Sequence, residues 1–393
     1  MLEIALILLL AAPTASSAQL SLSAADVSGQ APVSTASATV AVSTTAIRAK
    51  IFSETPVRGI HVTCWGAGLK DRRAGLIGKI KNSVINTVVV DIKETDGKIY
   101  IPGVEKAHRY GTYRPAIPEP EEMLGDFKEA GLYTVARIVV FKDRSLPLKR
   151  RDLAVLAPGG NLWRSDNGAT WLDPYNKEAW EYALDVAERA AALGFGEIQF
   201  DYLRYPSEGK TALCRYSKPH NAENAVANLK EFLIYARGRL KPYNVKISVD
   251  VFGLTTTAKH DMGIGQDLAA IAEYADYICP MMYPSHYYSG VYNLASPNSR
   301  PYKVVDRGLR DAFKRLGEDY AKLRPFLQDF SLGRHYGPHE VRAQIIAARK
   351  NLLESWVLWN PGNRYNWAAL TPQSYRAFVD PEYGEEAASE KAK

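Results

Sequence analysis

Short apolar runs recur along this chain, and most of them end in a polar or charged residue. Eight such runs alternate with longer segments in which apolar residues recur at helical spacing. The runs are Arg58–Thr63, Thr87–Asp91, Tyr133–Val140, Glu197–Asp201, Lys246–Val251, Tyr277–Tyr283, Pro325–Asp329 and Trp356–Asn360. Runs of this kind are typical of parallel strands that are buried on both faces.

The segments between the runs predict helices. The helix expected over Pro174–Leu193 follows Asp173, a suitable N-cap, and ends at Gly194. Further helices are expected over Glu119–Ala130, Asn221–Leu240, Ile264–Tyr274, Val304–Leu316 and Pro338–Leu353. Eight strand–helix units predict an α/β fold closed into a (β/α)8 TIM barrel. The alternative is an open, doubly wound sheet, but the Gly-Ala-Gly sequence at 66–68 is a poor match to its phosphate loop.

The two ends of the chain lack this pattern. Residues 1–18 combine an apolar stretch with small residues, as a signal peptide does, although the usual basic residue near the start is missing. Residues 19–50 are rich in Ser, Ala and Thr and predict a linker, whereas 379–393 predict a charged tail. The barrel is therefore expected over 51–378 of an exported protein, periplasmic, at the cell surface or secreted. Ile4–Ala12 is too short to span a bilayer, so no membrane span is expected in the mature chain.

Charge and motifs exclude several classes of protein. The formal net charge is +6 and no basic run stands out, so no nucleic-acid partner is expected. Three cysteines are too few, and odd in number, for a disulfide framework. His335 and His339 have metal-like spacing, but Pro338 between them begins a helix, so no metal is expected. Neither a Gly-x-Ser-x-Gly elbow nor a phosphate-binding loop is present, and no cofactor is expected.

Long connections follow the second, third, fourth and sixth predicted strands, over Ile92–Pro118, Phe141–Asp173, Tyr202–His220 and Pro284–Tyr302. In a barrel of parallel strands, all of them lie at the carboxyl end, where they would wall a cleft.

Period-two alternation predicts which side chains face that cleft. Gln199 and Asp201 share one face of their strand. The same reasoning groups Gly59, His61 and Thr63; Thr87, Val89 and Asp91; Ser248 and Asp250; Met281 and Tyr283; and Leu327 and Asp329, with Arg137 as the polar member of the third strand. The expected result is a ring of side chains at the barrel mouth that contains several carboxylates.

Cleavage of a glycosidic bond needs two carboxyl groups, of which one is ionised and the other is protonated. Asp201 is the candidate nucleophile or stabiliser, and Asp250 is the leading acid/base candidate because neighbouring strands lie about 4.8 Å apart. Asp329 and Asp91 would assist. Glu94 adds another acid near the mouth, unless it only shapes the turn at Asp96-Gly97. The alternative for all these acids is an ion pair with an arginine of the mouth, or the capping of a helix.

Aromatic residues are plentiful, with 23 Tyr and 7 Trp, and their flat faces suit sugar rings. The side chains expected to hold the sugar are His61, Arg137, Gln199, Tyr202, Arg204, Tyr283 and Trp359. For any one aromatic residue, plain barrel packing is an equally good explanation.

Six motifs together resemble the glycoside hydrolase barrels of the DUF4015 type, over Val57 to Phe378. They are Arg58-Gly-Ile-His61, Asn86-Thr-Val-Val-Val-Asp91, Trp171-Leu-Asp-Pro174, Ile198-Gln-Phe-Asp-Tyr-Leu-Arg-Tyr-Pro206, Val249-Asp-Val-Phe-Gly253 and Asp276-Tyr-Ile-Cys-Pro-Met-Met-Tyr-Pro284. The resemblance implies a TIM barrel, polysaccharide hydrolysis and a catalytic role for Asp201.

More distant relatives differ at informative positions. Chitinase-type barrels are similar, but Leu203 stands where their proton donor would be, which argues against their substrate-assisted chemistry. Amylase-type barrels carry acids on strands four, five and seven, where Asp201, Asp250 and Asp329 fall here, although their strand-five acid is Glu.

The resulting hypothesis is an exported glycoside hydrolase that acts on a polysaccharide or oligosaccharide by paired carboxylate chemistry. One alternative is a non-catalytic carbohydrate-binding barrel, which the missing strand-four glutamate favours. A second is a metal-dependent polysaccharide deacetylase. The sugar, its linkage, the stereochemical outcome and the oligomeric state are left open.

Overall fold

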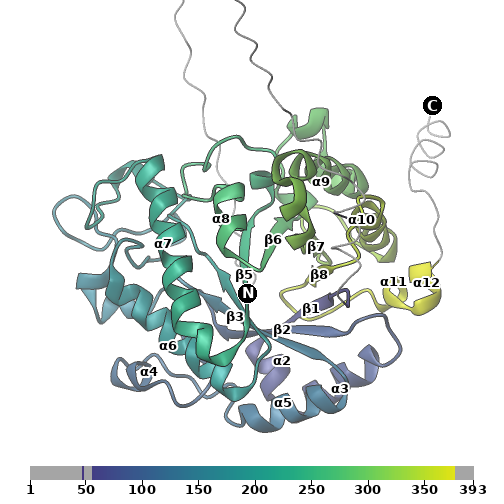
Figure 1. Ribbon diagram of the computed structural model, residues 1–393, viewed down its shortest axis with the longest axis horizontal. Helices are drawn as coiled ribbons and strands as arrows, with labels where there is room; N and C mark the ends of the chain where they lie inside the picture. The colour runs from purple at the N-terminus through teal and green to yellow at the C-terminus, as the bar shows by residue number, and fades with distance from the viewer. Residues whose placement is uncertain (1–46, 48–54, 377–393) are drawn as a thin grey trace, which may run out of the picture.

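The computed structural model describes Ile47 and residues 55–376. The predicted signal-like segment, the charged tail and all of the linker except Ile47 lie outside the described residues. Parallel strands form one closed barrel in which each strand pairs with the next and β8 pairs with β1 (Figure 1). The strands are β1 (Arg58–Val62), β2 (Thr87–Lys93), β3 (Tyr133–Val139), β4 (Glu197–Asp201), β5 (Lys246–Phe252), β6 (Tyr277–Met282), β7 (Phe326–Gln328) and β8 (Trp356–Trp359). The predicted (β/α)8 barrel is confirmed, and the eight strands occupy the eight predicted runs.

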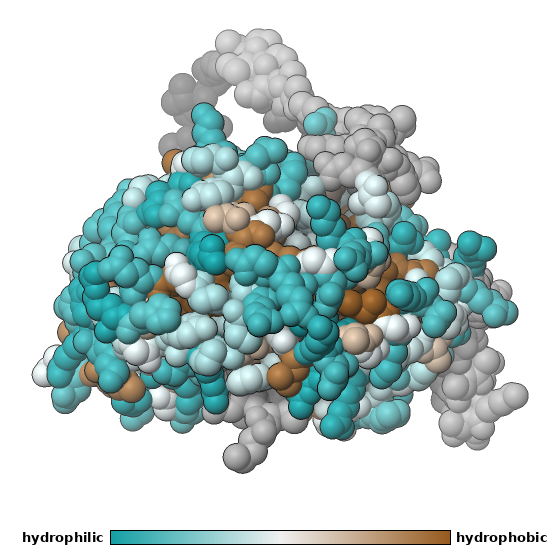
Figure 2. All heavy atoms as spheres, turned by 90° about the horizontal axis from the view of Figure 1, so that it is seen from below, coloured by the Kyte–Doolittle hydropathy of each residue, from teal (hydrophilic) through white to brown (hydrophobic). Residues whose placement is uncertain are grey.

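Helices surround this barrel and connect its strands (Figure 1). They are α2 (Cys64–Gly68), α3 (Lys70–Ile80), α4 (Glu105–Arg109), α5 (Pro120–Glu129), α6 (Lys177–Leu193), α7 (Ala222–Leu240), α8 (Leu268–Tyr274), α9 (Pro301–Leu316), α10 (Pro338–Lys350), α11 (Trp367–Leu370) and α12 (Pro372–Arg376). No helix in the described part of the chain is both long and apolar enough to cross a membrane. Figure 2 shows one side of the outer layer, where hydrophobic side chains appear in separate patches within a mainly hydrophilic surface.

The ends of α6 test the capping prediction. Gly194 ends the helix at a φ of 105°, as predicted, because glycine has no Cβ to oppose this conformation. The predicted N-cap is wrong. Asn176 caps the helix by accepting a hydrogen bond from the Glu178 backbone N–H. Asp173 instead accepts from the backbone N–H groups of Tyr175 and Ser217, which hold the loop after β4 against the start of the helix.

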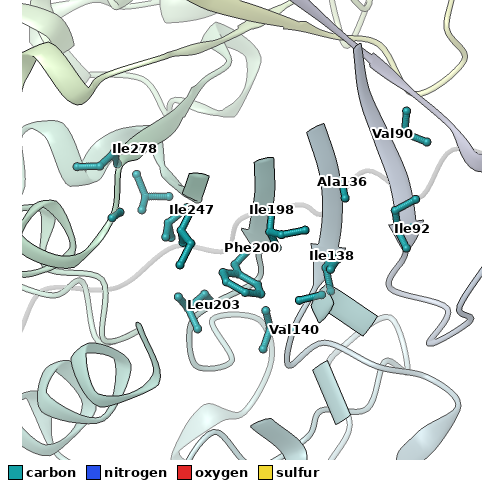
Figure 3. Close-up of a cluster of buried hydrophobic side chains, with 14 of the residues drawn as sticks. Val90, Ile92, Ala136, Ile138, Val140, Ile198, Phe200, Leu203, Ile247 and Ile278 are labelled. Atoms are coloured by element: carbon teal, nitrogen blue, oxygen red, sulfur yellow. The ribbon is translucent and has the colours of Figure 1, made fainter. Parts of the chain in front are cut away.

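Two apolar layers lie on opposite faces of the strands. Outward-facing side chains such as Ile138, Ile198 and Phe200 lie close together on neighbouring strands (Figure 3). Phe200 packs against Phe232 of α7, with 5.2 Å between the ring centroids. A smaller cluster fills the barrel itself and contains Val89, Val135, Cys279, Tyr283, Phe326, Phe330 and Val357. The side chains of β2, β3, β4 and β6 therefore face inward and outward as the alternation predicted, and the interpretation of Cys279 as a core residue is confirmed.

The parity predicted for the seventh strand is wrong. Phe326 belongs to the inner cluster, whereas Leu327 packs in the outer one. The run Pro325-Phe326-Leu327 has no alternation of polar and apolar residues, so it carries no local signal of which side chain faces inward.

Candidate active site

One buried guanidinium organises the carboxyl end of the barrel. Arg137 on β3 donates to Asp201 Oδ2 from Nε at 3.0 Å and from Nη2 at 2.5 Å. Its Nη1 donates to Asp91 Oδ1 and to Glu94 Oε1, both at 2.6 Å, and Asp250 Oδ2 lies 3.9 Å from Nε. The predicted gathering of Asp91, Asp201 and Asp250 around the mouth is therefore confirmed, and so is the alternative that these acids pair with Arg137.

Asp201 is the last residue of β4 and Asp250 lies two residues before the end of β5, yet their electrostatic environments differ. Asp201 is bound by Arg137, and its Oδ1 accepts the backbone N–H of Tyr202 at 2.6 Å. Asp250 is fully buried, and its Oδ1 has no hydrogen-bond partner among the described residues. Burial and the nearby charge of Asp201 raise the pKa of Asp250 well above its usual value, against the opposing effect of Arg137. The two carboxyl groups therefore differ in their partners, and Asp250 is the one whose surroundings favour the protonated form.

The spacing of this pair suits glycosidic chemistry. Because Nε of Arg137 lies 3.0 Å from one Oδ2 and 3.9 Å from the other, these oxygens are at most about 7 Å apart. That limit admits the roughly 5–5.5 Å of retaining glycosidases and only the short end of the roughly 6.5–9.5 Å of inverting ones.

Asp91 connects the cluster to the wall of the mouth. His61 on β1 contacts Asp91 Oδ2 through Nε2 at 2.8 Å, and its Nδ1 lies 3.3 Å from the Asn360 carbonyl oxygen. Burial by itself would raise the pKa of Asp91, but His61 and Arg137 lower it below its usual value. The His61 ring stacks on Trp359 at 3.8 Å between centroids, and the Arg137 guanidinium lies 4.8 Å from the same ring. His61, Arg137 and Trp359 are therefore one contiguous wall.

Glu94 belongs to the group of carboxylates around Arg137. The sequence alone did not decide between this position and a role only in the turn. Glu94 follows the last residue of β2, and its carboxylate bonds Arg137 instead of only shaping the turn at Gly97. Burial, Asp91 and Asp201 raise its pKa, while Arg137 opposes the rise. The signal in the sequence was its position three residues after Asp91, at the predicted barrel mouth.

Asp329 is bound by Asn366 and, among the described residues, not by Arg137. Its Oδ2 accepts the Asn366 backbone N–H at 3.0 Å, and its Oδ1 accepts the Asn366 side-chain amide at 2.5 Å. Burial raises the pKa of Asp329 to about 7, and the two hydrogen bonds from Asn366 oppose this rise. This contact ties the end of β7 to the loop after β8. A catalytic role for Asp329 stays a prediction.

The remaining predicted side chains divide into two groups. Gln199 and Tyr283 lie inside the barrel, where Gln199 Nε2 is 3.3 Å from Cys279 Sγ and its Oε1 has no partner within the described residues. Arg204 is instead buried in the loop after β4, where it donates to Glu208 and lies 4.9 Å from the Tyr202 ring. Tyr202 follows Asp201 directly with a φ of 51°, a conformation that costs energy for a non-glycine residue. Sugar binding by these residues stays a prediction.

A hollow of about 370 Å³ opens at the opposite end of the barrel, where the strands begin. Its lining includes Asn86, Tyr133, Lys246, Tyr277 and Arg324 but no carboxylate. Among the described residues, carboxyl groups therefore gather in the Arg137 cluster and not around this hollow. Within the described ranges, no group of three or more His, Cys, Asp and Glu side chains is arranged to hold a metal ion.

Comparison with known proteins identifies related barrels. The model of the DUF4015 family, described as "Putative glycosyl hydrolase domain", matches residues 59–365. The comparison with curated proteins gave no match. Among solved structures, a hypothetical protein from Ruminiclostridium thermocellum ATCC 27405 is 33% identical and covers 49% of this chain and 97% of its own, with a TM-score of 0.44.

Two further structures show the same fold at lower identity. The PgaB (BpsB) glycoside hydrolase domain from Bordetella bronchiseptica is 16% identical, with a TM-score of 0.60, and the match covers 81% of this chain and 97% of that one. The α-galactosidase TtGalA from Thermus thermophilus is 14% identical, with a TM-score of 0.50, and the match covers 82% of this chain and 60% of that one. At these identities the likeness concerns the barrel and not the substrate.

Proposed function

This chain belongs to the DUF4015 family of glycosyl hydrolase domains, and we propose that it hydrolyses O-glycosidic bonds of a polysaccharide with paired carboxyl groups at its barrel mouth. The observation that carries this proposal is the contrast between Asp201 and Asp250. They end adjacent strands, yet one is bound by Arg137 while the other has a raised pKa. Pairs of acids whose environments separate their pKa values are the arrangement that acid–base chemistry requires.

In this proposal Asp201 is the ionised carboxylate and acts on the anomeric carbon, as a nucleophile or as an electrostatic stabiliser. A second, protonated carboxyl donates to the glycosidic oxygen. Two neighbours of Asp201 have raised pKa values and qualify for that role: Asp250, the candidate from the sequence, and Glu94. Trp359 and Tyr283 would support the sugar ring. Asp91, through Arg137, would hold the orientation of Asp201.

The proposed substrate lies outside the cytoplasm. This part of the proposal rests on residues 1–18, whose apolar stretch and small residues suit export, and on the linker-like composition of 19–50. A polysaccharide of the cell envelope or the surroundings would then be within reach of the barrel.

The test is the Asp201→Asn variant, assayed for released reducing ends on a broad panel of polysaccharides. We expect kcat to fall by about a thousandfold or more, because an amide can neither attack nor stabilise the developing positive charge. Glu129→Gln is the matched control, since Glu129 is an exposed acid that ends α5 at the opposite end of the barrel. If wild-type protein cleaves a glycan and Asp201→Asn cleaves it equally well, the proposed mechanism is wrong.

A second candidate function is carbohydrate binding without catalysis. The burial of the acids favours it, since Asp201 and Asp250 are only 3% and 1% exposed and side chains of the mouth must move before a sugar reaches them. Glycan binding by wild-type protein, with no reducing ends released from any bound glycan, would support this function over hydrolysis.

A further inference from the structure

The four carboxyl groups around Arg137 differ in their access to solvent. The side chains of Asp91, Asp201 and Asp250 are 5%, 4% and 1% exposed, whereas that of Glu94 is 32% exposed. A general acid must contact the leaving oxygen and must recover its proton from water in each turnover. Of these four groups, Glu94 is the one that solvent reaches, so it can exchange its proton with water and is open to a ligand at the mouth.

Glu94 and Asp201 are held by the same guanidinium. Glu94 bonds Nη1 of Arg137, while Asp201 is bound through Nε and Nη2. A shared guanidinium keeps the two carboxylates closer than the roughly 9.5 Å upper limit of two-carboxylate glycosidases. A sugar that enters the mouth would therefore meet Glu94 first, and it would reach Asp201 only after side chains of the mouth have moved.

The backbone that carries Glu94 is fixed by buried contacts. The preceding residue, Lys93, is completely buried and pairs with Asp143 at 2.9 Å. The Glu94 carbonyl accepts the backbone N–H of Gly97 at 2.9 Å, and a Cβ at Gly97 would collide with the Asp143 carboxylate. The turn therefore requires glycine, and its close approach to Asp143 sets where the Glu94 side chain begins.

We propose that Glu94 is the general acid and base of glycosidic cleavage, an inference that rests on the proposed function. The Glu94 carboxyl gives its proton to the glycosidic oxygen as the bond from that oxygen to the anomeric carbon breaks, and the alcohol departs. The Asp201 carboxylate takes up the positive charge that develops on the anomeric carbon, by bonding to that carbon or by stabilising it, until the oxygen of a water molecule replaces it there. The resulting Glu94 carboxylate takes a proton from the water that attacks the anomeric carbon, which restores the acid. Asp250 keeps its own proton throughout and is not part of the transfer. The raised pKa of Glu94 supports this assignment.

The experiment compares Glu94→Gln and Asp250→Asn on two substrates of the same sugar. One is the natural polysaccharide, and the other is a dinitrophenyl glycoside, whose leaving group departs without a proton. For Glu94→Gln we expect a loss of about 10²–10⁴-fold in kcat/KM on the polysaccharide and a much smaller loss on the dinitrophenyl glycoside. In wild-type protein, kcat/KM on the polysaccharide should fall at high pH as the Glu94 carboxyl loses its proton. This fall should be absent in Glu94→Gln. Glu105→Gln, an exposed acid in α4, is the matched control and should leave both rates unchanged.

Three outcomes overturn the assignment. The first is that Glu94→Gln retains the wild-type rate on the polysaccharide. The second is that Glu94→Gln loses the rates on both substrates equally. The third is that the difference between the substrates appears in Asp250→Asn instead, which would make Asp250 the proton donor. Glu94→Asp separates chemistry from folding, because it retains a carboxyl with a shorter reach and should recover part of the lost rate. The proposed function fails separately, if wild-type protein cleaves neither substrate or Asp201→Asn stays active.

Discussion

At the scale of the residue, four aspartates at strand ends have different chemistry because their partners differ. Asp91 is bound by His61 and Arg137, which lower its pKa, and Asp201 is bound by Arg137 and a backbone N–H. Asp250 is buried beside another acid, and Asp329 is bound by Asn366. The identity of an acid therefore does not decide its protonation; its neighbours do.

The first prediction concerns Asp329 and pH. Burial raises the pKa of Asp329 from an ordinary 3.8 to about 7, so the folded protein binds this proton more tightly than the unfolded chain. The resulting stabilisation is fully present below about pH 4 and is lost as the pH rises through about 7. Asp329→Asn removes this titration. From pH 5 to pH 8, we expect the free energy of unfolding in urea to fall more for wild-type protein than for the variant.

The difference over this window is at most roughly 3 kcal/mol, since about two of the pKa units of the shift lie above pH 5 and each corresponds to about 1.4 kcal/mol. Other buried acids titrate equally in both proteins, so the comparison isolates Asp329. Parallel stability curves over this pH range would show that Asp329 ionises alike in the folded and unfolded chain.

At the scale of the element, helix ends show how local signals compete with tertiary contacts. Gly194 was predictable, because a left-handed residue at the end of a helix is a local backbone requirement. The start of α6 was not. Asp173 has the chemistry of an N-cap, but its carboxylate is used by Ser217, a residue 44 positions later, and the cap moves to Asn176.

The second prediction compares a glycine just past the end of one helix, Gly194, with a glycine inside another, Gly238. Gly194→Ala should lower the free energy of unfolding by about 1 kcal/mol, because alanine is strained at a φ of 105°. Gly238→Ala, inside α7, should raise it by up to about 1 kcal/mol, because alanine has the higher helix propensity. Among the residues that the structure describes, an added Cβ has no neighbour within 4 Å at either position, so packing does not contribute. Denaturant unfolding would measure both changes, and shifts of the same sign would contradict the backbone explanation.

At the scale of the whole molecule, buried ions close both ends of the barrel around an apolar middle. Arg137 binds acids at the mouth, and Glu197 pairs with Arg324 at 2.7 Å at the opposite end. Between them lies the inner cluster that includes Val89, Phe326 and Val357. Removing one member of a buried pair leaves a charge without compensation, which is more destabilising than the loss of the attraction alone.

The third prediction compares the two ends. Arg324→Met should lower the free energy of unfolding by about 3–5 kcal/mol, because Glu197 is left buried and unpaired. The double variant with Glu197→Gln should recover part of this loss. Its activity per folded molecule should equal that of wild-type protein, because the pair lies far along the barrel from Asp201. Arg137→Met should lose both stability and activity. A loss of activity in the folded double variant would show that the two ends are coupled.

The sequence by itself determined the eight strands, their order in a closed barrel and the placement of Asp91, Arg137, Asp201 and Asp250 at one end. These features follow from apolar runs and from alternation, which are properties of neighbouring residues along a strand. Tertiary structure alone decided the inward side chain of β7, the contact of Asp329 with Asn366 and the entry of Glu94 into the cluster. It also decided that Asp201 contacts Arg137, while Oδ1 of Asp250 has no hydrogen-bond partner in the described part of the chain. Such contacts join residues tens of positions apart, and they exist only once the barrel has closed.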